Sequence, residues 1–323
     1  MAVWIVTAVL ILAVLAGIFL FRCVGKMFLK NISRKNPGEK FSADIDVSFY
    51  KNSPVNKLAA DGMAYMKTLT REEVSISSED GLRLHAVLFP AGSSPGKFVI
   101  GIHGFQSHAL NEFGPHIEFY RSCGFSMLLP DDRAHGYSEG RYITMGVRDR
   151  RDCISWAKYL AERFGPDIKI LLHGVSMGGA TVLSAVGEDD LPPQVIGIVS
   201  DCGYTCVKDA LAVQIRNLMH VPPAVPVKIC QWYAKHRAGF DFNEARPIDQ
   251  VRKAGAPVFI VQGADDVLVP RHMAEELYEA CSSEKKLLIV EHANHAESIA
   301  ADPDGYHGAM HELFGISPDA ASP

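Results

Sequence analysis

The pentapeptide GVSMG at residues 174–178 constrains the fold of this chain more than any other stretch. It follows an apolar run at 168–172, which is typical of a buried strand, and it precedes small residues that favour a helix over 177–187. Glycines on both sides of Ser176 allow the backbone to turn sharply where a larger side chain would clash. A strand, a tight turn and a helix in this order would hold the Ser176 hydroxyl above the carboxyl end of the strand.

Strands and helices alternate along most of the chain. Strands are expected at 98–102, 125–129, 168–172, 195–200, 258–262 and 287–291, and helices at about 115–123, 147–164, 177–187, 271–281 and 304–314. Ahead of them, alternating runs at 74–77 and 82–89 flank an Asp80-Gly81 turn, which predicts an antiparallel hairpin. The pattern predicts an α/β fold, with a mostly parallel sheet, helices on both faces and an antiparallel edge.

The N-terminus has a different composition. Residues 2–21 contain no charged residue, and a helix of that length spans about 30 Å, the thickness of a bilayer core, so we expect a transmembrane helix. No Lys or Arg precedes this run, which argues against a cleaved signal peptide. Under the positive-inside rule, the basic residues that follow predict a cytoplasmic body, and an uncleaved anchor of opposite orientation is the alternative. These basic residues are Arg22, Lys26, Lys30, Arg34 and Lys35.

Three further segments complete the expected organisation. Residues 22–70 are expected to form a juxtamembrane connector, with helical spacing of apolar residues between 58 and 69. The interval 205–249 is longer than a crossover connection needs, and we interpret it as a lid over the carboxyl end of the sheet. A packing insertion without a gating role is the alternative. The main domain is expected at 71–315, followed by a C-terminal tail at 316–323.

Composition excludes several classes of partner. The net charge is −5, and no basic patch is interleaved with aromatic residues, which excludes nucleic acid as a partner. The seven cysteines are scattered and lack C-x-x-C pairs, so we interpret them as reduced and mostly buried. Cys202, Cys206 and Cys230 have no histidine at a familiar metal-site spacing, and we expect neither a metal nor an organic cofactor.

A serine nucleophile needs a base, and the base needs an orienting carboxylate. His295, just after the last predicted strand, is the expected base, and His292 is its competitor. The acid is expected in the loop after the preceding strand, where Asp265 and Asp266 are adjacent. The order Ser, Asp, His along the chain is the one expected for a fold with its nucleophile on such a strand–turn–helix motif.

These motifs resemble those of the α/β-hydrolase superfamily, whose fold is built on a mostly parallel sheet of the eight-stranded type. Members often carry G-x-x-D-x-x-V-P, which residues 263–270 match in register, and the resemblance implies that Asp266 is the acid. Asp265 is then a loop-capping or solvated carboxylate. Asp201 is the alternative acid, because some members place the carboxylate after that strand.

The oxyanion of an acyl-transfer reaction needs preorganised N–H donors. The amide of Met177, directly after the serine, is one expected donor, and the resemblance implies that the amide of Phe105 in the HGFQ stretch is the second. His103 would then be structural. Residues 131–140 resemble the superfamily motif D-x-R-G-H-G-x-S, with alanine at 134 where glycine is usual. The resemblance implies structural roles for Arg133 and His135. With residues 143–146, this stretch is similar to Bem46-type and prolyl-oligopeptidase-like proteins, and the resemblance covers about 70–315.

The resemblance implies a membrane-anchored serine hydrolase that uses Ser176, His295 and Asp266. Carboxylic esters are the expected substrates, and an apolar lid beside a membrane segment favours lipid or medium-chain acyl esters. A peptidase, an amidase or a thioesterase would use the same three residues, so these alternatives stay open. A membrane-tethered binding protein that keeps the fold without catalysis is the alternative from another class. The sequence predicts no oligomeric state.

Overall fold

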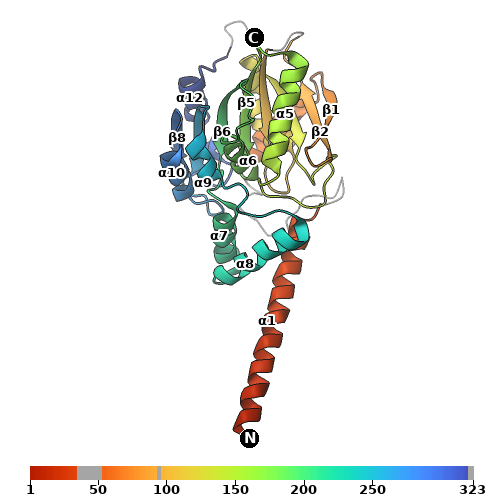
Figure 1. Cartoon of the computed structure of the whole chain (residues 1–323). Helices are drawn as coiled ribbons and strands as arrows, with labels where there is room; N and C mark the ends of the chain where they lie inside the picture. Colours follow the sequence, from red (N-terminus) through yellow and green to blue (C-terminus); the bar gives the residue numbers. More distant parts are fainter. Residues whose placement is uncertain (35–52, 93–95, 319–323) are drawn as a thin grey trace.

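The computed structural model describes residues 1–34, 53–92 and 96–318 of the 323 residues, and a single mixed sheet forms its centre (Figure 1). Eight strands follow one another in the order β1-β2-β4-β3-β5-β6-β7-β8. β2 pairs antiparallel with β1 and β4, and every later pair is parallel. The predicted parallel sheet with an antiparallel hairpin at its edge is confirmed. The strands are β1 (Glu72–Ser77), β2 (Arg83–Phe89), β3 (Lys97–Ile102), β4 (Ser126–Asp131), β5 (Lys169–Val175), β6 (Val195–Asp201), β7 (Val258–Gly263) and β8 (Lys285–Val290).

Helices cover both faces of this sheet (Figure 1). Helices α5, α6 and α10 pack on one face, and α2, α4 and α12 pack on the other. The α-helices are α1 (Ala2–Ile32), α2 (Val55–Met66), α3 (Ala109–Glu112), α4 (Ile117–Ser122), α5 (Asp149–Phe164), α6 (Met177–Ala185), α7 (Val207–Met219), α8 (Ala224–Tyr233), α9 (Pro247–Gln250), α10 (Arg271–Ala280), α11 (Ser298–Ala301) and α12 (Pro303–Phe314).

Alternation of side chains along the strands explains the two cores. On β3, Phe98 and Ile100 enter the cluster under α5 and α6, whereas Val99 enters the cluster on the opposite face. Successive side chains of a strand point to opposite faces, so a strand buried on both sides is apolar at every position. The apolar stripe of α5, which includes Ile154 and Leu160, is buried against the sheet as its spacing predicts.

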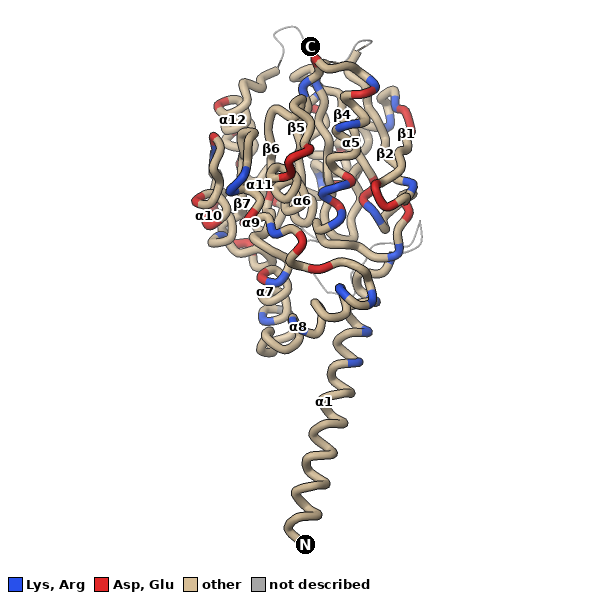
Figure 2. The backbone as a smooth tube through the Cα atoms, in the orientation of Figure 1, with Lys and Arg blue, Asp and Glu red and all other residues tan. Residues whose placement is uncertain are grey.

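Helix α1 extends eleven residues past the end predicted for it at Phe21, and its two halves have different surroundings. Every residue from Ala2 to Leu20 is exposed, whereas Gly25, Phe28 and Ile32 are buried against the body. By length and composition α1 is able to cross a membrane, and a signal sequence meets the same criteria. Figure 2 shows that the charged residues of α1 lie only at its body end. Residues 35–52 of the connector predicted at 22–70, Lys35 among them, and residues 319–323 of the tail predicted at 316–323 lie outside the described residues.

The interval 205–249 forms α7, α8 and a following π-turn at Ala234–Ala238, on the side of the body from which α1 emerges (Figure 1). Helix α8 packs directly against α1, since a Cβ placed on Gly25 would lie 1.9 Å from the Tyr233 ring. A third apolar cluster joins Phe28 of α1 and Cys230 of α8 to Met177, which follows β5. These helices therefore lie at the carboxyl edge of the sheet.

Candidate active site

The turn after β5 holds Ser176 in a backbone conformation that few side chains adopt. Its φ is +56°, in the left-handed region, and its N–H donates to the Asp201 carbonyl at 2.8 Å. The turn depends on its glycines, because a Cβ on Gly178 would lie 1.9 Å from the Ile102 carbonyl oxygen. A Cβ on Gly174 would meet the Gly178 carbonyl at 2.0 Å. The close approach of these backbones explains why the pentapeptide carries glycine on both sides of the serine.

Loops after β5, β7 and β8 bring Ser176, Asp266 and His295 together. The Ser176 hydroxyl lies 2.8 Å from His295 Nε2, and His295 Nδ1 lies 2.6 Å from an Asp266 carboxylate oxygen. The other Asp266 oxygen accepts the amides of Leu268 and Val269 at 2.8 and 2.9 Å. Both oxygens of Asp266 thus accept hydrogen bonds, and in this geometry His295 donates from Nδ1 to Asp266 and accepts the Ser176 hydroxyl at Nε2.

Burial and the neighbouring carboxylates together determine the pKa of His295. Burial alone would lower the pKa of the imidazole, but the charge of Asp266 and the hydrogen bond to it outweigh burial and raise that pKa above its usual 6.5. Asp201 adds to the rise through its own charge. The ring is therefore arranged to stabilise an imidazolium when it takes up a proton.

The competing residues occupy different places. The His292 side chain is 94% exposed and faces Asp265 across 3.9 Å, so neither residue reaches Ser176. Asp201 is buried, and its carboxyl accepts the Tyr306 hydroxyl rather than the imidazole of the base. Burial raises the pKa of Asp201 to about 7. Asp201 therefore acts on His295 through its buried charge. Among the described residues, no hydrogen bond joins the Asp201 carboxyl to the His295 ring.

The amides of Phe105 and Met177 are the two predicted oxyanion donors, and Met177 directly follows Ser176. Met177 is the first residue of α6, where the N–H has no partner within the helix. Across the described part of the chain, neither amide donates to a protein acceptor. In the loop at 103–106, which we name the oxyanion loop, a Cβ on Gly104 would lie 3.3 Å from the Ser176 Cβ. An N–H group without an acceptor directly after the serine, and a second one in a loop that approaches the serine, suit the stabilisation of an oxyanion.

Two buried histidines hold the oxyanion loop. His103 donates from Nδ1 to the Gly104 carbonyl at 2.8 Å and accepts the Asp132 amide at Nε2, at 3.1 Å. His135 accepts the Gln106 amide at 3.2 Å, and burial lowers the pKa of its imidazole well below the usual value. Both rings are engaged with the backbone, which fits the structural roles that the resemblance implies for them.

Further contacts of the oxyanion loop were not predicted from the sequence. The Glu112 carboxyl accepts the Gly104 amide at 2.6 Å, and burial raises its pKa. The Gln106 side-chain amide donates to the Asn31 carbonyl of α1 at 2.6 Å. No local pattern marks Glu112 or Asn31, because each meets the loop only through the tertiary fold. The loop is thus fixed from both α3 and α1.

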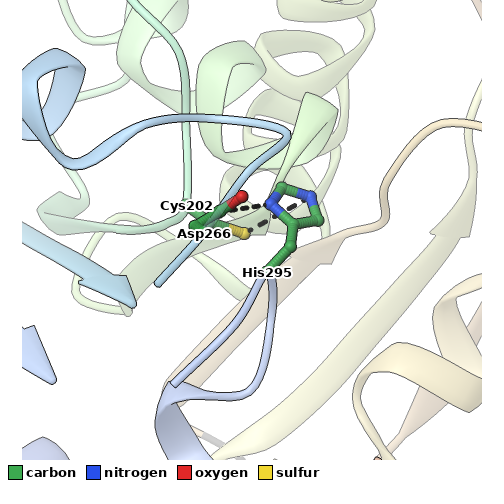
Figure 3. Close-up of side chains that lie close together, drawn as sticks. All are labelled: Cys202, Asp266 and His295. Carbon is green, nitrogen blue, oxygen red and sulfur yellow. Dashed lines mark hydrogen bonds and ion pairs between the residues drawn. The ribbon is translucent and has the colours of Figure 1, made fainter. Parts of the chain in front are cut away.

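Figure 3 shows Cys202 beside Asp266 and His295, an arrangement whose ligand atoms lie within 4.8 Å of one another. The Cys202 sulfur is 3.8 Å from His295 Nε2. A metal requires a thiolate, but burial, followed by the charges of Asp201 and Asp266, raises the pKa of this thiol well above its usual value. Both nitrogens of His295 also have partners already. The residues therefore do not fit a metal ion.

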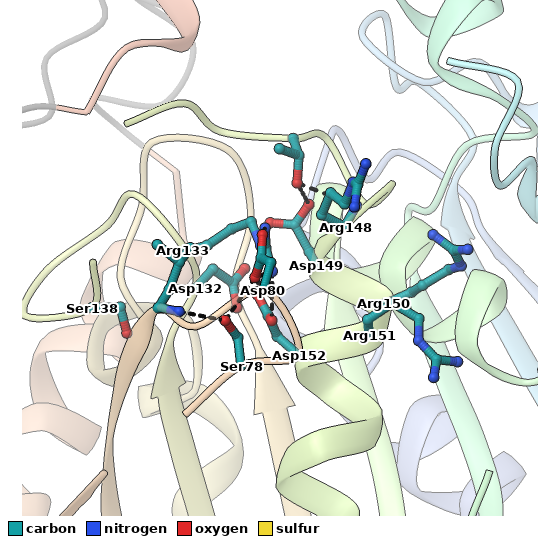
Figure 4. Close-up of polar contacts among 12 residues, drawn as sticks. Ser78, Asp80, Asp132, Arg133, Ser138, Arg148, Asp149, Arg150, Arg151 and Asp152 are labelled. Carbon is teal, nitrogen blue, oxygen red and sulfur yellow. Dashed lines mark hydrogen bonds and ion pairs between the residues drawn. The ribbon is translucent and has the colours of Figure 1, made fainter. Parts of the chain in front are cut away.

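The motif at 131–140 is built around Arg133 (Figure 4). Its guanidinium is buried and donates two hydrogen bonds to Asp152 of α5, at 2.6 and 2.7 Å. It also pairs with Asp80 in the turn of the β1–β2 hairpin at 3.0 Å. Ala134, where related motifs carry glycine, adopts φ +62°. Arg133 thus joins the edge hairpin to α5 and lies outside the site, as its predicted structural role requires.

Comparisons with known proteins agree with this fold. A family model described as serine aminopeptidase, S33, matches residues 93–238. The Bacillus subtilis protein YqkD is 27% identical over 216 residues, which make up 67% of this chain and 70% of YqkD. An esterase from Pyrococcus furiosus has the same fold, with a TM-score of 0.62 at 22% identity over 79% of this chain and 94% of the esterase. A puromycin-hydrolysing peptidase from Mycobacterium tuberculosis gives a TM-score of 0.58 at 20% identity, over 79% of this chain and 41% of the peptidase.

Proposed function

We propose that this chain, which belongs to the α/β-hydrolase superfamily of serine hydrolases, cleaves carboxylic esters with Ser176 as nucleophile. The observation that carries the proposal is the continuous hydrogen-bond chain from the Ser176 hydroxyl through His295 to Asp266. A serine hydroxyl becomes a competent nucleophile when a neutral imidazole accepts its proton, and a carboxylate fixes the tautomer that does so.

Each proton in the reaction has a place in this geometry. Ser176 Oγ attacks the acyl carbonyl while His295 Nε2 takes the hydroxyl proton, and the oxyanion accepts the amides of Phe105 and Met177. Such donors contribute about 3–4 kcal/mol each to the transition state. His295 then gives its proton to the departing alcohol, which leaves an acyl group on Ser176. Water attacks that ester, His295 takes its proton, and the acid is released as the proton returns to Ser176.

We further propose a single-pass membrane protein with a cytoplasmic body and a lid at 205–249. The exposed apolar half of α1 and the basic residues at its body end support the span and its direction. Tight packing of Gly25, Phe28 and Ile32 against the body supports retention of α1 in the folded protein rather than cleavage next to it. The apolar character of α1, α7 and α8 around the site supports medium-chain or lipid acyl groups as substrates.

The experiment compares the full chain in detergent micelles with its Ser176→Ala variant on p-nitrophenyl esters from acetyl to octanoyl. The proposal predicts hydrolysis by the wild type only, with kcat/KM rising with acyl length. Equal rates in the two proteins would contradict Ser176 as nucleophile. Turnover of the matched p-nitroanilides or thioesters in place of esters would move the assignment to an amidase or a thioesterase. Binding of esters without turnover would favour a non-catalytic protein.

A further inference from the structure

The position of α1 in a membrane determines where the other helices lie relative to the membrane surface. Its uncharged run ends at Phe21, so a bilayer spanned by α1 meets water at about that residue. The Phe21 ring lies 5.1 Å from the ring of Trp232 and 5.2 Å from that of Tyr233, both on α8. The carboxyl end of α8 therefore lies at the level of the membrane surface, the level at which Trp and Tyr side chains are enriched.

A set of apolar side chains is exposed on α7, on α8 and in the turn that joins them, and we name this set the α7–α8 surface. Its members are Met219 (48% exposed), Val221 (40%), Val225 (57%) and Trp232 (43%). Large exposed apolar groups that gather on one region mark an interaction surface rather than ordinary surface composition. Lys228 is exposed between Val225 and Trp232 at helical spacing, and such a lysine extends its ammonium from an apolar face toward lipid headgroups.

We propose that the α7–α8 surface lies in the interfacial layer of the membrane that α1 spans, and that acyl substrates reach Ser176 from this side. The proposal rests on the membrane span and the esterase activity proposed above. Its partner is lipid, because the surface is continuous with the one helix of the described chain that is apolar enough to cross a bilayer. Charge agrees, since Lys228 of α8 and Arg237 just after α8 are exposed and favour anionic headgroups.

The same layer extends to the site. Behind α8, Cys230 and Phe28 pack in one cluster with Met177, whose amide is a proposed oxyanion donor. The side chains between α8 and the residue after the nucleophile are therefore apolar, which suits an acyl chain on this side of the site. Helix α8 therefore has two roles. Its exposed face contacts the membrane, and its buried face separates the lipid from the candidate active site.

The three tryptophans of the chain provide a direct test. Trp4 lies on the exposed half of α1 and Trp156 is buried in the core, so the Trp4→Phe variant reports on Trp232. The full chain is reconstituted in phosphatidylcholine–phosphatidylglycerol vesicles whose acyl chains carry bromine near the headgroup or near the chain end. The proposal predicts stronger quenching by the shallow bromine than by the deep one. The Trp4→Phe/Trp232→Phe double variant, which keeps only Trp156, gives the unquenched baseline.

Quenching of Trp4→Phe at the level of that baseline would overturn the proposal and would indicate that protein, such as a second copy of the chain, covers the surface. The Trp232→Phe variant, which retains Trp4, shows separately whether α1 is in the bilayer. If Trp4 also remains unquenched, the membrane span itself is wrong, and the surface proposal is overturned with it. Because fluorescence needs no turnover, this result stands whether or not the chain proves to be an esterase.

Activity tests the route of the substrate. Val225→Asp should lower hydrolysis of an octanoyl ester embedded in vesicles about tenfold, the effect of losing one buried valine, and leave soluble p-nitrophenyl acetate unaffected. Val225→Ile, which keeps the side chain apolar, should behave as wild type on both esters. Equal loss on both esters, or no loss on either, would overturn the route. Absence of hydrolysis by the wild type would instead refute the esterase proposal while the quenching result stands.

Discussion

Two regions meet at the carboxyl edge of the sheet, and they are stabilised in different ways. At the active site, polar side chains from three loops form one hydrogen-bond chain, from Ser176 through His295 to Asp266. On the adjoining face, α1 and α8 pack through apolar contacts between segments far apart in the chain, such as Phe21 and Trp232. Substitutions in the first region should lower the rate of hydrolysis of every substrate. Substitutions in the second region should change the stability of the fold and the access of substrates to Ser176.

The largest effect is expected at the carboxylate of the first region. Asp266→Asn should lower kcat on soluble esters about 10⁴-fold, because an amide does not hold the imidazole in the tautomer that accepts the Ser176 proton. Asp265→Asn is the matched control, since this neighbouring carboxylate is exposed and faces His292. Steady-state kinetics in detergent measure both variants. Similar losses in the two would show that the motif had been placed one residue out of register.

The second effect concerns stability and separates the two halves of α1. Phe28 is buried in the cluster with α8, whereas Phe19 is exposed on the apolar half. Phe28→Ala should lower the free energy of unfolding by about 3–5 kcal/mol, the usual result of truncating a buried phenylalanine. Denaturant unfolding in micelles, with Phe19→Ala as control, measures the difference. If both variants unfold like the wild type, the body end of α1 is a tether and contributes nothing to the fold.

A smaller effect is expected where the two regions touch. Gln106→Ala removes the hydrogen bond from the oxyanion loop to the Asn31 carbonyl, and it should lower kcat by roughly 10- to 100-fold with little change in KM. Asn31→Ala keeps the backbone carbonyl and should have the weaker effect. The kcat and KM of both variants are measured separately on a soluble ester. An increase in KM alone would assign Gln106 to substrate binding rather than to positioning of the loop.

The smallest effect is a shift of the pH profile. Catalysis needs neutral His295, and Asp266 raises the pKa of that ring above 6.5 despite burial, so activity should fall as pH decreases through a value above 6.5. Asp201 ionises with a pKa of about 7, and its charge contributes to the rise. Asp201→Asn should therefore move the acid limb of kcat/KM to lower pH, whereas Asp265→Asn should not. An unmoved limb in Asp201→Asn would remove Asp201 from the electrostatics of the base.

The sheet and the position of each candidate residue could be predicted because short stretches of sequence determine them. The glycines around Ser176 are required by contacts inside one turn, and His295 and Asp266 each follow the end of a strand. The sequence predicts a juxtamembrane connector from residue 22 onward, which is wrong for residues 22–32, although Gly25, Phe28 and Ile32 recur at helical spacing there. Basic residues between them obscured that stripe.

Other contacts have no local signal. The hydrogen bond from Gln106 to Asn31 joins residues 75 positions apart, and nothing in either neighbourhood predicts the other. The same holds for Glu112, whose carboxyl reaches the Gly104 amide only because α3 folds back on the oxyanion loop. Such contacts form only when distant elements pack together, so no pattern within a single sequence predicts them.

Covalent labelling tests the central claim most directly. The full chain in micelles is treated with a fluorophosphonate, digested and mapped by mass spectrometry, alongside Ser176→Ala and His295→Ala. The account predicts one phosphonyl adduct on Ser176 in the wild type, none in Ser176→Ala, and much slower labelling in His295→Ala, where no base accepts the hydroxyl proton. An adduct on another serine, or equal labelling of all three proteins, would contradict Ser176 as the nucleophile.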